Sequence, residues 1–316
     1  PQLVGPRPNM SFRETARYVA YRAEEAFLID ENNDGRNDIA FWQDGYFEVH
    51  RQNQLGQFSK ISVNLDANLK DMLSGYAEIS IGEDSRNGNG KNRLLDEIVD
   101  INNDQVSDLI VKRIKSEGIF GWESEYEVYL GAVDENNLLI FAENPSSIIR
   151  TDGFQFDNER LDISGDGNQE FLITSVDISI GAVIRALIAR SVSVDVSIYK
   201  MINGEYPAKP STRKKISARF DFGSGDLFIP AVIVADVTGD GQKDLLVQKG
   251  QSTLLVYPGQ KNQNMFSKKA IKLSLTLPDS RPGFIVHDLD HDGRDELILT
   301  HDGNGNTAIS VVSFKD

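Results

Sequence analysis

The sequence predicts an all-β fold built from repeated units of four antiparallel strands. Two observations lead to this expectation. A nine-residue acidic segment recurs five times along the 316 residues, and short apolar runs rich in β-branched residues stand beside it. Apolar runs of this length next to turn signals are typical of buried strands. We therefore expect each acidic segment to be a loop that joins two strands of one sheet.

The five segments share oxygen-bearing side chains at positions 1, 3, 5 and 9. Four of them have glycine at position 6, and Gln105 takes its place in the second. Their first residues lie 52 to 74 residues apart along the chain. They occupy residues 30–38, 100–108, 162–170, 236–244 and 288–296, and are named loops 1 to 5 below.

This spacing suits a hard cation. Calcium takes about six to eight oxygen ligands, and a tight loop turns the side chains of positions 1, 3 and 5 inward while position 7 adds its backbone carbonyl. A glycine at position 6 permits the positive φ that such a bend needs. The sequence therefore predicts about five calcium ions. The expected ligands are Asp30, Asn32, Asp34, Arg36 and Asp38 in loop 1, Asp100, Asn102, Asp104, Val106 and Asp108 in loop 2, Asp162, Ser164, Asp166, Asn168 and Glu170 in loop 3, Asp236, Thr238, Asp240, Gln242 and Asp244 in loop 4, and Asp288, Asp290, Asp292, Arg294 and Glu296 in loop 5.

The loops differ in the charge they offer. Loop 5 carries four carboxylates at the ligand positions, and each of the other loops carries three. Ser164 and Thr238 stand at position 3 of loops 3 and 4, and a hydroxyl is a poorer donor to calcium than a carboxylate or carboxamide. Because ligand charge raises calcium affinity, we expect loop 5 to bind most tightly.

The EF-hand is the main competing interpretation of these acidic loops. An EF-hand needs a bidentate glutamate at position 12 of its loop. That position is apolar in all five segments, which excludes the EF-hand and, for the same reason, dockerin-like modules. The residues there are Phe41, Val111, Ile173, Val247 and Leu299.

The strands are clearest in the first and fourth units. In the first unit we expect strands over 24–29, 38–43, 46–51 and 57–65, with a two-residue hairpin turn at Asp44-Gly45. In the fourth unit we expect them over 230–235, 244–248, 252–257 and 268–275. Four antiparallel strands in each unit are typical of the blade of a β-propeller.

The number of units fits the chain length. A mean loop spacing of about 64 residues gives five units in about 320 residues, so we expect one domain over 1–316 with five blades. A six-bladed ring with one blade lacking a metal loop is the alternative. Residues 1–14 are interpreted as an N-terminal extension. The fifth unit supplies three strands (283–287, 296–300 and 307–314), and we expect the strand-like stretch 16–21 to complete it.

The third unit carries an insertion over about 178–191. Residues 181–190 are apolar with two arginines, which predicts a short amphipathic helix that covers a blade edge. A membrane- or partner-binding helix is the alternative. The strict alternation of residues 192–198 predicts a strand, and Asn203-Gly204 predicts a hairpin turn.

The composition excludes several functions. A net charge of −15 argues against a nucleic-acid partner, which requires a basic stripe. The absence of cysteine excludes thiol catalysis and zinc–thiolate sites, and no Gly-x-Ser-x-Gly elbow is present. His287, His291 and His301 lie near loop 5, where we expect structural roles. We therefore expect no catalytic residue and no organic cofactor.

At these loops the sequence resembles the FG-GAP/VCBS repeats of integrin-alpha-type propellers. The five loops with their apolar flanks carry the resemblance, above all residues 234–247, and the five units cover nearly the whole chain. The Phe-Gly/Gly-Ala-Pro signature is not evident. The resemblance implies a β-propeller with calcium between the first two strands of each blade, an extracytoplasmic setting and a binding role.

These expectations together define a function. We expect a non-catalytic protein- or glycan-binding (adhesion) module, monomeric, without a transmembrane segment, and secreted, periplasmic or displayed at the cell surface. Loops of this charge resemble those of extracellular modules, with dissociation constants of about 10⁻⁴–10⁻³ M. A carbohydrate-active enzyme of the polysaccharide-lyase kind on a calcium-stabilised propeller is the alternative.

Overall fold

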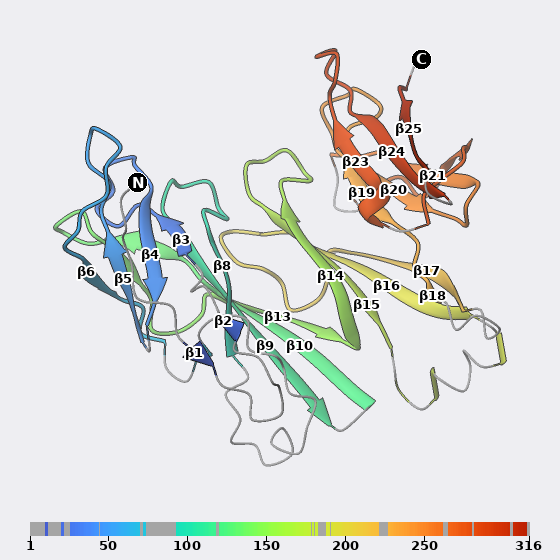
Figure 1. Ribbon diagram of the computed structural model, residues 1–316. Coiled ribbons are helices and arrows are strands. Elements are labelled where there is room, and N and C mark those ends of the chain that lie inside the picture. Colours follow the sequence, from blue (N-terminus) through green and yellow to red (C-terminus); the bar gives the residue numbers. More distant parts are fainter. Residues whose placement is uncertain are drawn as a thin grey trace. The chain divides into compact units, whose positions relative to one another are not determined.

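The computed structural model shows an all-β protein, as predicted (Figure 1). It describes residues 10–11, 20–21, 26–43, 45–69, 72–73, 93–117, 120–177, 179, 181–182, 188–189, 191–220, 227–261, 265–279, 281–303 and 306–314. The chain divides into two compact units, each described here by itself. Unit 1 comprises Pro1–Thr151 with Gly204–Ala208, and unit 2 comprises Asp152–Asn203 with Lys209–Asp316.

In its described residues, unit 1 contains two large sheets and two small ones. Sheet 1 has the antiparallel order β3 (Ala26–Ile29), β4 (Asp38–Trp42), β5 (Tyr46–His50) and β6 (Val63–Asp66). Sheet 2 has the order β13 (Ser147–Asp152), β10 (Phe120–Tyr129), β9 (Asp108–Glu117), β8 (Arg93–Val99) and β7 (Met72–Leu73), with β7 parallel to β8. The small sheets pair β1 (Met10–Ser11) with β2 (Ala20–Tyr21), and β11 (Gly131–Val133) with β12 (Leu139–Phe141).

One face of sheet 1 packs against one face of sheet 2. Ala40, Phe47 and Val49 from sheet 1 share a buried cluster with Leu109 and Val111 from sheet 2. These residues alternate along their strands, so that every second side chain enters this core. The cluster holds the starts of β4 and β9 together, next to loops 1 and 2.

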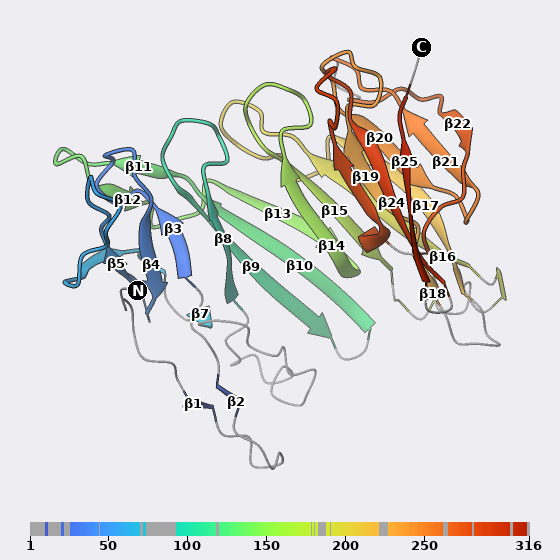
Figure 2. The ribbon, with the colours of Figure 1, turned by 45° about the horizontal axis from the view of Figure 1, so that its top comes forward.

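The described part of unit 2 contains three sheets, whose long strands are well seen in Figure 2. Sheet 3 has the order β14 (Phe154–Leu161), β15 (Glu170–Val176), β16 (Ser191–Tyr199), β17 (Thr212–Phe220) and β18 (Leu227–Phe228). Sheet 4 has the order β19 (Val232–Ala235), β20 (Asp244–Gln248), β21 (Thr253–Tyr257) and β22 (Ile271–Ser274). The 3₁₀ turn η2 (Arg281–Gly283) precedes sheet 5, which comprises β23 (Phe284–His287), β24 (Glu296–Gly303) and β25 (Asn306–Val312).

Sheet 4 is buried on both faces. Leu245 and Val247 pack against sheet 3, in a cluster that includes Val196. Leu246, which points to the opposite face, packs with Leu297 of sheet 5. The three sheets of unit 2 are therefore stacked face to face in chain order.

Each of the five loops joins two consecutive strands of one sheet, as predicted. These two are called the first and second strands of the sheet below, and the third strand is β5, β10, β16, β21 or β25; in sheet 2 the short strand β7 precedes them. The connected pairs are β3 and β4, β8 and β9, β14 and β15, β19 and β20, and β23 and β24, and every pair is antiparallel. All five position-12 residues lie in the second strand of their pair and are buried, at 0–9% exposure.

Several expected strand limits are wrong. Strand β6 covers Val63–Asp66 instead of 57–65. The reason is that residues 51–59 form a hydrogen-bonded turn before it. In this turn the Asn53 side-chain oxygen accepts the N–H groups of Leu55 and Gln57. Strand β22 covers Ile271–Ser274 instead of 268–275. Among the described residues, sheets 2 and 3 have five strands instead of the expected four.

The expected fourth strand of the last sheet is also wrong within the described residues. Ala20–Tyr21 pairs with Met10–Ser11 in a two-stranded sheet, and sheet 5 has three strands. Of the predicted helix at 181–190, residues 181–182 and 188–189 are described and are helical, and the rest lies outside the described residues. The predicted strand at 192–198 is confirmed as β16.

Candidate metal loops

The five loops share one backbone shape. In every loop the residues at positions 4 and 6 have positive φ, a region that glycine and asparagine enter more readily than most residues. These residues are Asn33 and Gly35, Asn103 and Gln105, Gly165 and Gly167, Gly239 and Gly241, and His291 and Gly293. The bend expected at position 6 is confirmed in all five loops.

Three hydrogen bonds recur inside every loop. The position-1 carboxylate accepts the N–H of position 6, with N···O distances of 2.6–3.1 Å. The position-5 carboxylate accepts the N–H of position 7 at 2.8–3.1 Å. The position-9 carboxylate accepts the N–H of position 2 at 2.7–3.1 Å. The loops are therefore shaped by their own carboxylates, and the ligand role of these residues stays a prediction.

The position-9 carboxylates are the most buried members of the loops. Four of these five residues are 0% exposed and Glu296 is 3% exposed. In sheets 1, 2 and 4 the second carboxylate oxygen accepts a further N–H from the residue two positions past the third strand. The pairs are Gln52 with Asp38 at 2.7 Å, Gly131 with Asp108 at 2.7 Å, and Gly259 with Asp244 at 2.8 Å. Position 9 thus ties each of these loops to the third strand of its sheet.

Burial changes the acidity of these carboxyl groups. Desolvation raises the pKa of Asp38, Asp244 and Glu170 above the usual range, while the backbone N–H groups that they accept oppose the increase. The same balance raises the pKa of Asp108 to about 7. A cation held beside such a carboxyl would favour its ionised form.

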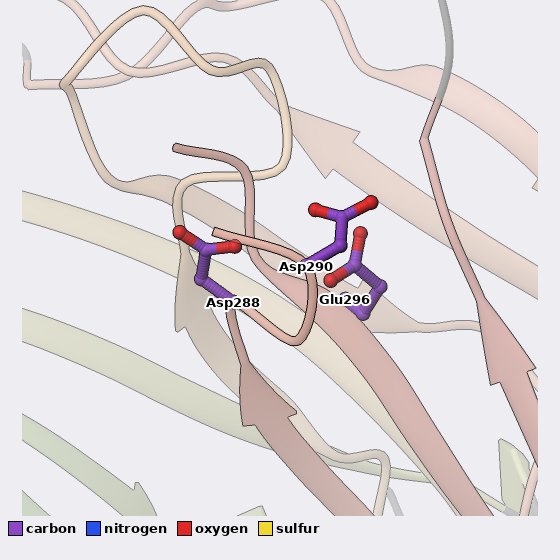
Figure 3. A group of neighbouring side chains, drawn as sticks. All are labelled: Asp288, Asp290 and Glu296. Atoms are coloured by element: carbon purple, nitrogen blue, oxygen red, sulfur yellow. The ribbon is translucent and has the colours of Figure 1, made fainter. Parts of the chain in front are cut away.

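Loop 5 is the place where carboxylates converge. Oxygen atoms of Asp288, Asp290 and Glu296 lie within 4.8 Å of one another (Figure 3). Among the described residues no other group of three acidic, histidine or cysteine side chains comes this close. The Oδ1 atom of Asp288 is buried and accepts no hydrogen bond. A buried acceptor without a donor is costly, and a calcium ion would satisfy it. The residues of loop 5 therefore fit calcium.

Loop 1 shows part of the same arrangement. The Oδ1 atom of Asn32, at position 3, is buried and has no hydrogen-bond partner. The carboxylate of Asp34, at position 5, is paired with the guanidinium of Arg36. Position 3 of loop 1 therefore offers calcium a free ligand oxygen, whereas the position-5 carboxylate is already engaged by a guanidinium.

Loops 4 and 5 are joined by hydrogen bonds. The Asp295 carboxylate accepts the N–H of Asp236 at 2.6 Å and pairs with the Lys243 ammonium at 2.9 Å. In return, the N–H of Asp295 donates to the carbonyl of Asp236 at 2.7 Å. A residue outside the predicted ligand set therefore fixes loop 5 against position 1 of loop 4.

Loop 2 gives a test of the shared loop shape. Gln105 has φ +69°, and a side chain in the left-handed region costs about 1–2 kcal/mol. Glycine would remove this strain but would gain entropy in the unfolded chain. We expect Gln105→Gly to raise the free energy of unfolding by about 0.5–1 kcal/mol in urea denaturation. Gly241 has φ +78° and open space where a Cβ would lie. The reciprocal change Gly241→Gln should therefore lower the free energy of unfolding by a similar amount. A loss of stability in Gln105→Gly would contradict the shared loop shape.

A second charged cluster lies away from the loops, on the face of sheet 2 that also bears Val111. The Glu127 carboxylate pairs with Arg93 at 2.5 Å and Arg113 at 3.2 Å, and accepts the Tyr129 hydroxyl at 2.9 Å. The Glu125 carboxylate pairs with Arg150 at 2.7 Å. Sequence spacing did not reveal this cluster, because its members come from four strands. Both carboxylates are engaged by guanidinium groups, which favours a role in holding the strands together.

A pocket of about 780 Å³ is formed by residues 51–53, 57–61 and 63. Its lining combines carboxamide, hydroxyl and ammonium groups with the ring of Phe58. Two contacts connect the pocket to loop 1. The N–H of Gln52 donates to the Asp38 carboxylate, and the Arg51 guanidinium forms an ion pair with the Glu31 carboxylate. The pocket therefore presents hydrogen-bond donors and acceptors beside loop 1.

The comparisons with known proteins give no family. No family model matches the chain, and no curated protein matches it. The chain is similar to the pore of the Photorhabdus luminescens Tc holotoxin, at 15% identity and a TM-score of 0.39, over 95% of this chain and 12% of the toxin chain. It is similar to an Agrocybe aegerita lectin that recognises non-reducing terminal N-acetylglucosamine, at 13% identity and a TM-score of 0.36, over 91% of this chain and 79% of the lectin.

A third similarity is to an engineered GH43 glycoside hydrolase, at 10% identity and a TM-score of 0.30, over 90% of this chain and 49% of the hydrolase. At these TM-scores the similarities carry no argument about function. In the described part of the chain, no helix has the length and apolar character needed to cross a membrane.

Proposed function

We propose that this chain is a calcium-stabilised β-propeller of the FG-GAP/VCBS kind that acts as a non-catalytic protein- or glycan-binding module outside the cytoplasm. The observation that carries the proposal is the convergence of Asp288, Asp290 and Glu296 in loop 5 around a buried carboxylate oxygen without a donor. Loop 5 is also the loop with the largest number of carboxylates at the ligand positions.

The stacking of the sheets supports the propeller. Sheet 4 is packed on both faces by its neighbours in the sequence, as a blade is in a ring. At position 11 of loops 1, 3 and 4, Ala40, Leu172 and Leu246 each pack against the next sheet of the same unit. The first and last sheets keep exposed apolar side chains, Leu28 at 58% and Ile285, Ile309 and Val311 at 49–67%. Closure of five blades into a ring would bury such faces.

The binding role is proposed for the pocket beside loop 1. Asp38, the position-9 acid of that loop, holds the N–H of Gln52 in the pocket wall. Calcium in loop 1 would fix Asp38 and, through it, this wall. The setting outside the cytoplasm follows from the weak affinity expected of such loops, since they would stay empty at resting cytosolic calcium.

One experiment tests calcium and binding together. Calcium uptake is measured by calorimetry, the melting temperature is measured in millimolar calcium and in EDTA, and protein and glycan arrays are screened under both conditions. A site at a hundredfold excess over its dissociation constant stabilises the native state by about 2.7 kcal/mol. We expect a higher melting temperature and stronger array binding in calcium.

Asp288→Asn is expected to remove the tightest site and most of the calcium-dependent rise in melting temperature. Glu143→Gln, which removes an exposed charge outside the loops, is the matched control and should behave like the wild type. A melting temperature that is the same in calcium and in EDTA would overturn the calcium proposal. Array binding that persists equally in EDTA would separate the binding role from the metal.

A further inference from the structure

Loop 3 contains a positive charge of its own. Lys200 is the first residue after β16, and its Nζ lies 2.7 Å from the Ser164 hydroxyl oxygen and 2.8 Å from the Asp166 carboxylate. These two side chains occupy positions 3 and 5 of loop 3. They are the same two positions that are predicted to turn inward toward calcium in every loop.

The contacts of Lys200 continue into the loop. The Ser164 hydroxyl, which accepts from Nζ, donates to the Glu170 carboxylate at 2.9 Å, so that position 9 is joined to the same network. The backbone N–H of Lys200 donates to the Ser211 hydroxyl at 3.2 Å, which fixes the start of the side chain. An ammonium group has three donors and no acceptor, so it satisfies loop oxygens as a cation does.

In sheets 1, 2 and 4 the corresponding residue does not enter its loop in this way. One residue past the third strand, sheet 1 has Arg51, which pairs with Glu31 at position 2 instead of positions 3 and 5. Sheets 2 and 4 have the uncharged Leu130 and Pro258 at this place. Lys243 of loop 4 is directed to Asp295. Loop 3 is therefore distinguished by a lysine that its own sheet supplies.

We propose that the Lys200 ammonium is the resident cation of loop 3 and that loop 3 takes up no calcium in the native protein. A calcium ion bound to the oxygens of Ser164 and Asp166 would lie next to the ammonium and be repelled by it. Loop 3 also lacks a carboxylate or carboxamide at position 3, so it should bind calcium more weakly than loops 1, 2 and 5, which have one. The residues of loop 3 thus do not fit the metal that loop 5 fits.

The first test is made in EDTA and does not depend on calcium binding anywhere in the chain. The free energies of unfolding are measured for Lys200→Met, Asp166→Asn and the double variant. Each single substitution should lower stability, and the double variant should lose less than the sum, by a factor of about two to five in the unfolding equilibrium constant. Methionine keeps most of the unbranched stem, so lost packing is kept small. Additive losses, or a Lys200→Met variant with unchanged stability, would overturn the proposal.

The second test counts ions. Calorimetric titration with calcium should give the same number of bound ions for Asp166→Asn as for the wild type, whereas Asp288→Asn should lose one. An Asp166→Asn variant that binds one ion fewer than the wild type would overturn the proposal. If the wild type binds no calcium, the calcium function fails and the coupling measured in EDTA alone decides the role of Lys200.

Discussion

Replacing Asp244 with alanine is expected to lower the free energy of unfolding by about 3–5 kcal/mol. This carboxylate is 0% exposed and accepts the N–H groups of Val237 and Thr238, both at 3.0 Å, and of Gly259 at 2.8 Å. Alanine would leave three backbone donors without an acceptor, and each such buried group costs about 1–3 kcal/mol. The measurement is urea denaturation in EDTA, so that a bound cation plays no part.

The control for this prediction is Asp240→Ala, at position 5 of the same loop. Asp240 is exposed and accepts the N–H of Gln242 at 2.9 Å, so its loss should cost about 0.5–1 kcal/mol. Similar losses for the two variants would mean that position 9 has no special structural role. The expected difference separates two kinds of loop carboxylate: position 9, which holds the sheet together, and positions 1, 3 and 5, which face the proposed metal.

The difference between the buried position-9 carboxylate and the carboxylates at positions 1, 3 and 5 affects how calcium would act on the loops. A loop whose position-9 acid is buried and hydrogen bonded keeps its shape before any metal arrives. Calcium would then add stability to a formed loop and need not fold it. The same reasoning explains how loop 3 keeps the common backbone shape with a lysine in place of an ion.

The repeated loop and its two flanking strands could be predicted from the sequence because their signals are local. Spacing of oxygen-bearing residues within nine positions and adjacent β-branched runs located all five loop–strand pairs. In sheet 4 the strand Asp244–Gln248 was predicted with the limits that it has. The positive φ at position 6 was also predictable, since four loops place glycine there.

Other features depend on pairing between distant residues and gave no local signal. Lys200 is 34 residues from Asp166, with two strands and an insertion between them. The order of sheet 2 places β13 beside β10 although two short strands intervene in the chain. Strand β6 begins later than expected, because side-chain hydrogen bonds from Asn53 satisfy the preceding backbone in a turn. Periodicity alone does not distinguish such a segment from a strand.

The glycines that face position 9 give the second large effect. The N–H of Gly259 donates to Asp244, and a Cβ at Gly259 would lie 2.6 Å from the carbonyl oxygen of Lys243 and 2.8 Å from Cβ of Gln242. Gly131 is placed in the same way, with a Cβ that would meet the carbonyl oxygen of Ser107 at 2.2 Å. In both sheets this glycine stands two residues past the tyrosine that ends the third strand.

We therefore expect Gly259→Ala to lower the free energy of unfolding by about 2–4 kcal/mol, because the methyl group must push the third strand from the loop and weaken the bond to Asp244. The control is Gln52→Ala at the corresponding place in sheet 1, where a side chain is already accommodated and the N–H donates to Asp38 at 2.7 Å. That variant should lose about 0.5 kcal/mol or less, since its backbone bond is kept. Both are measured by urea denaturation in EDTA.

Because the methyl group and the carboxylate act on one contact, the double variant Gly259→Ala/Asp244→Ala should lose less than the sum of the single variants. Additive losses would show that the clash at Gly259 is independent of position 9, and the proposed link between loop 4 and the third strand would then be wrong.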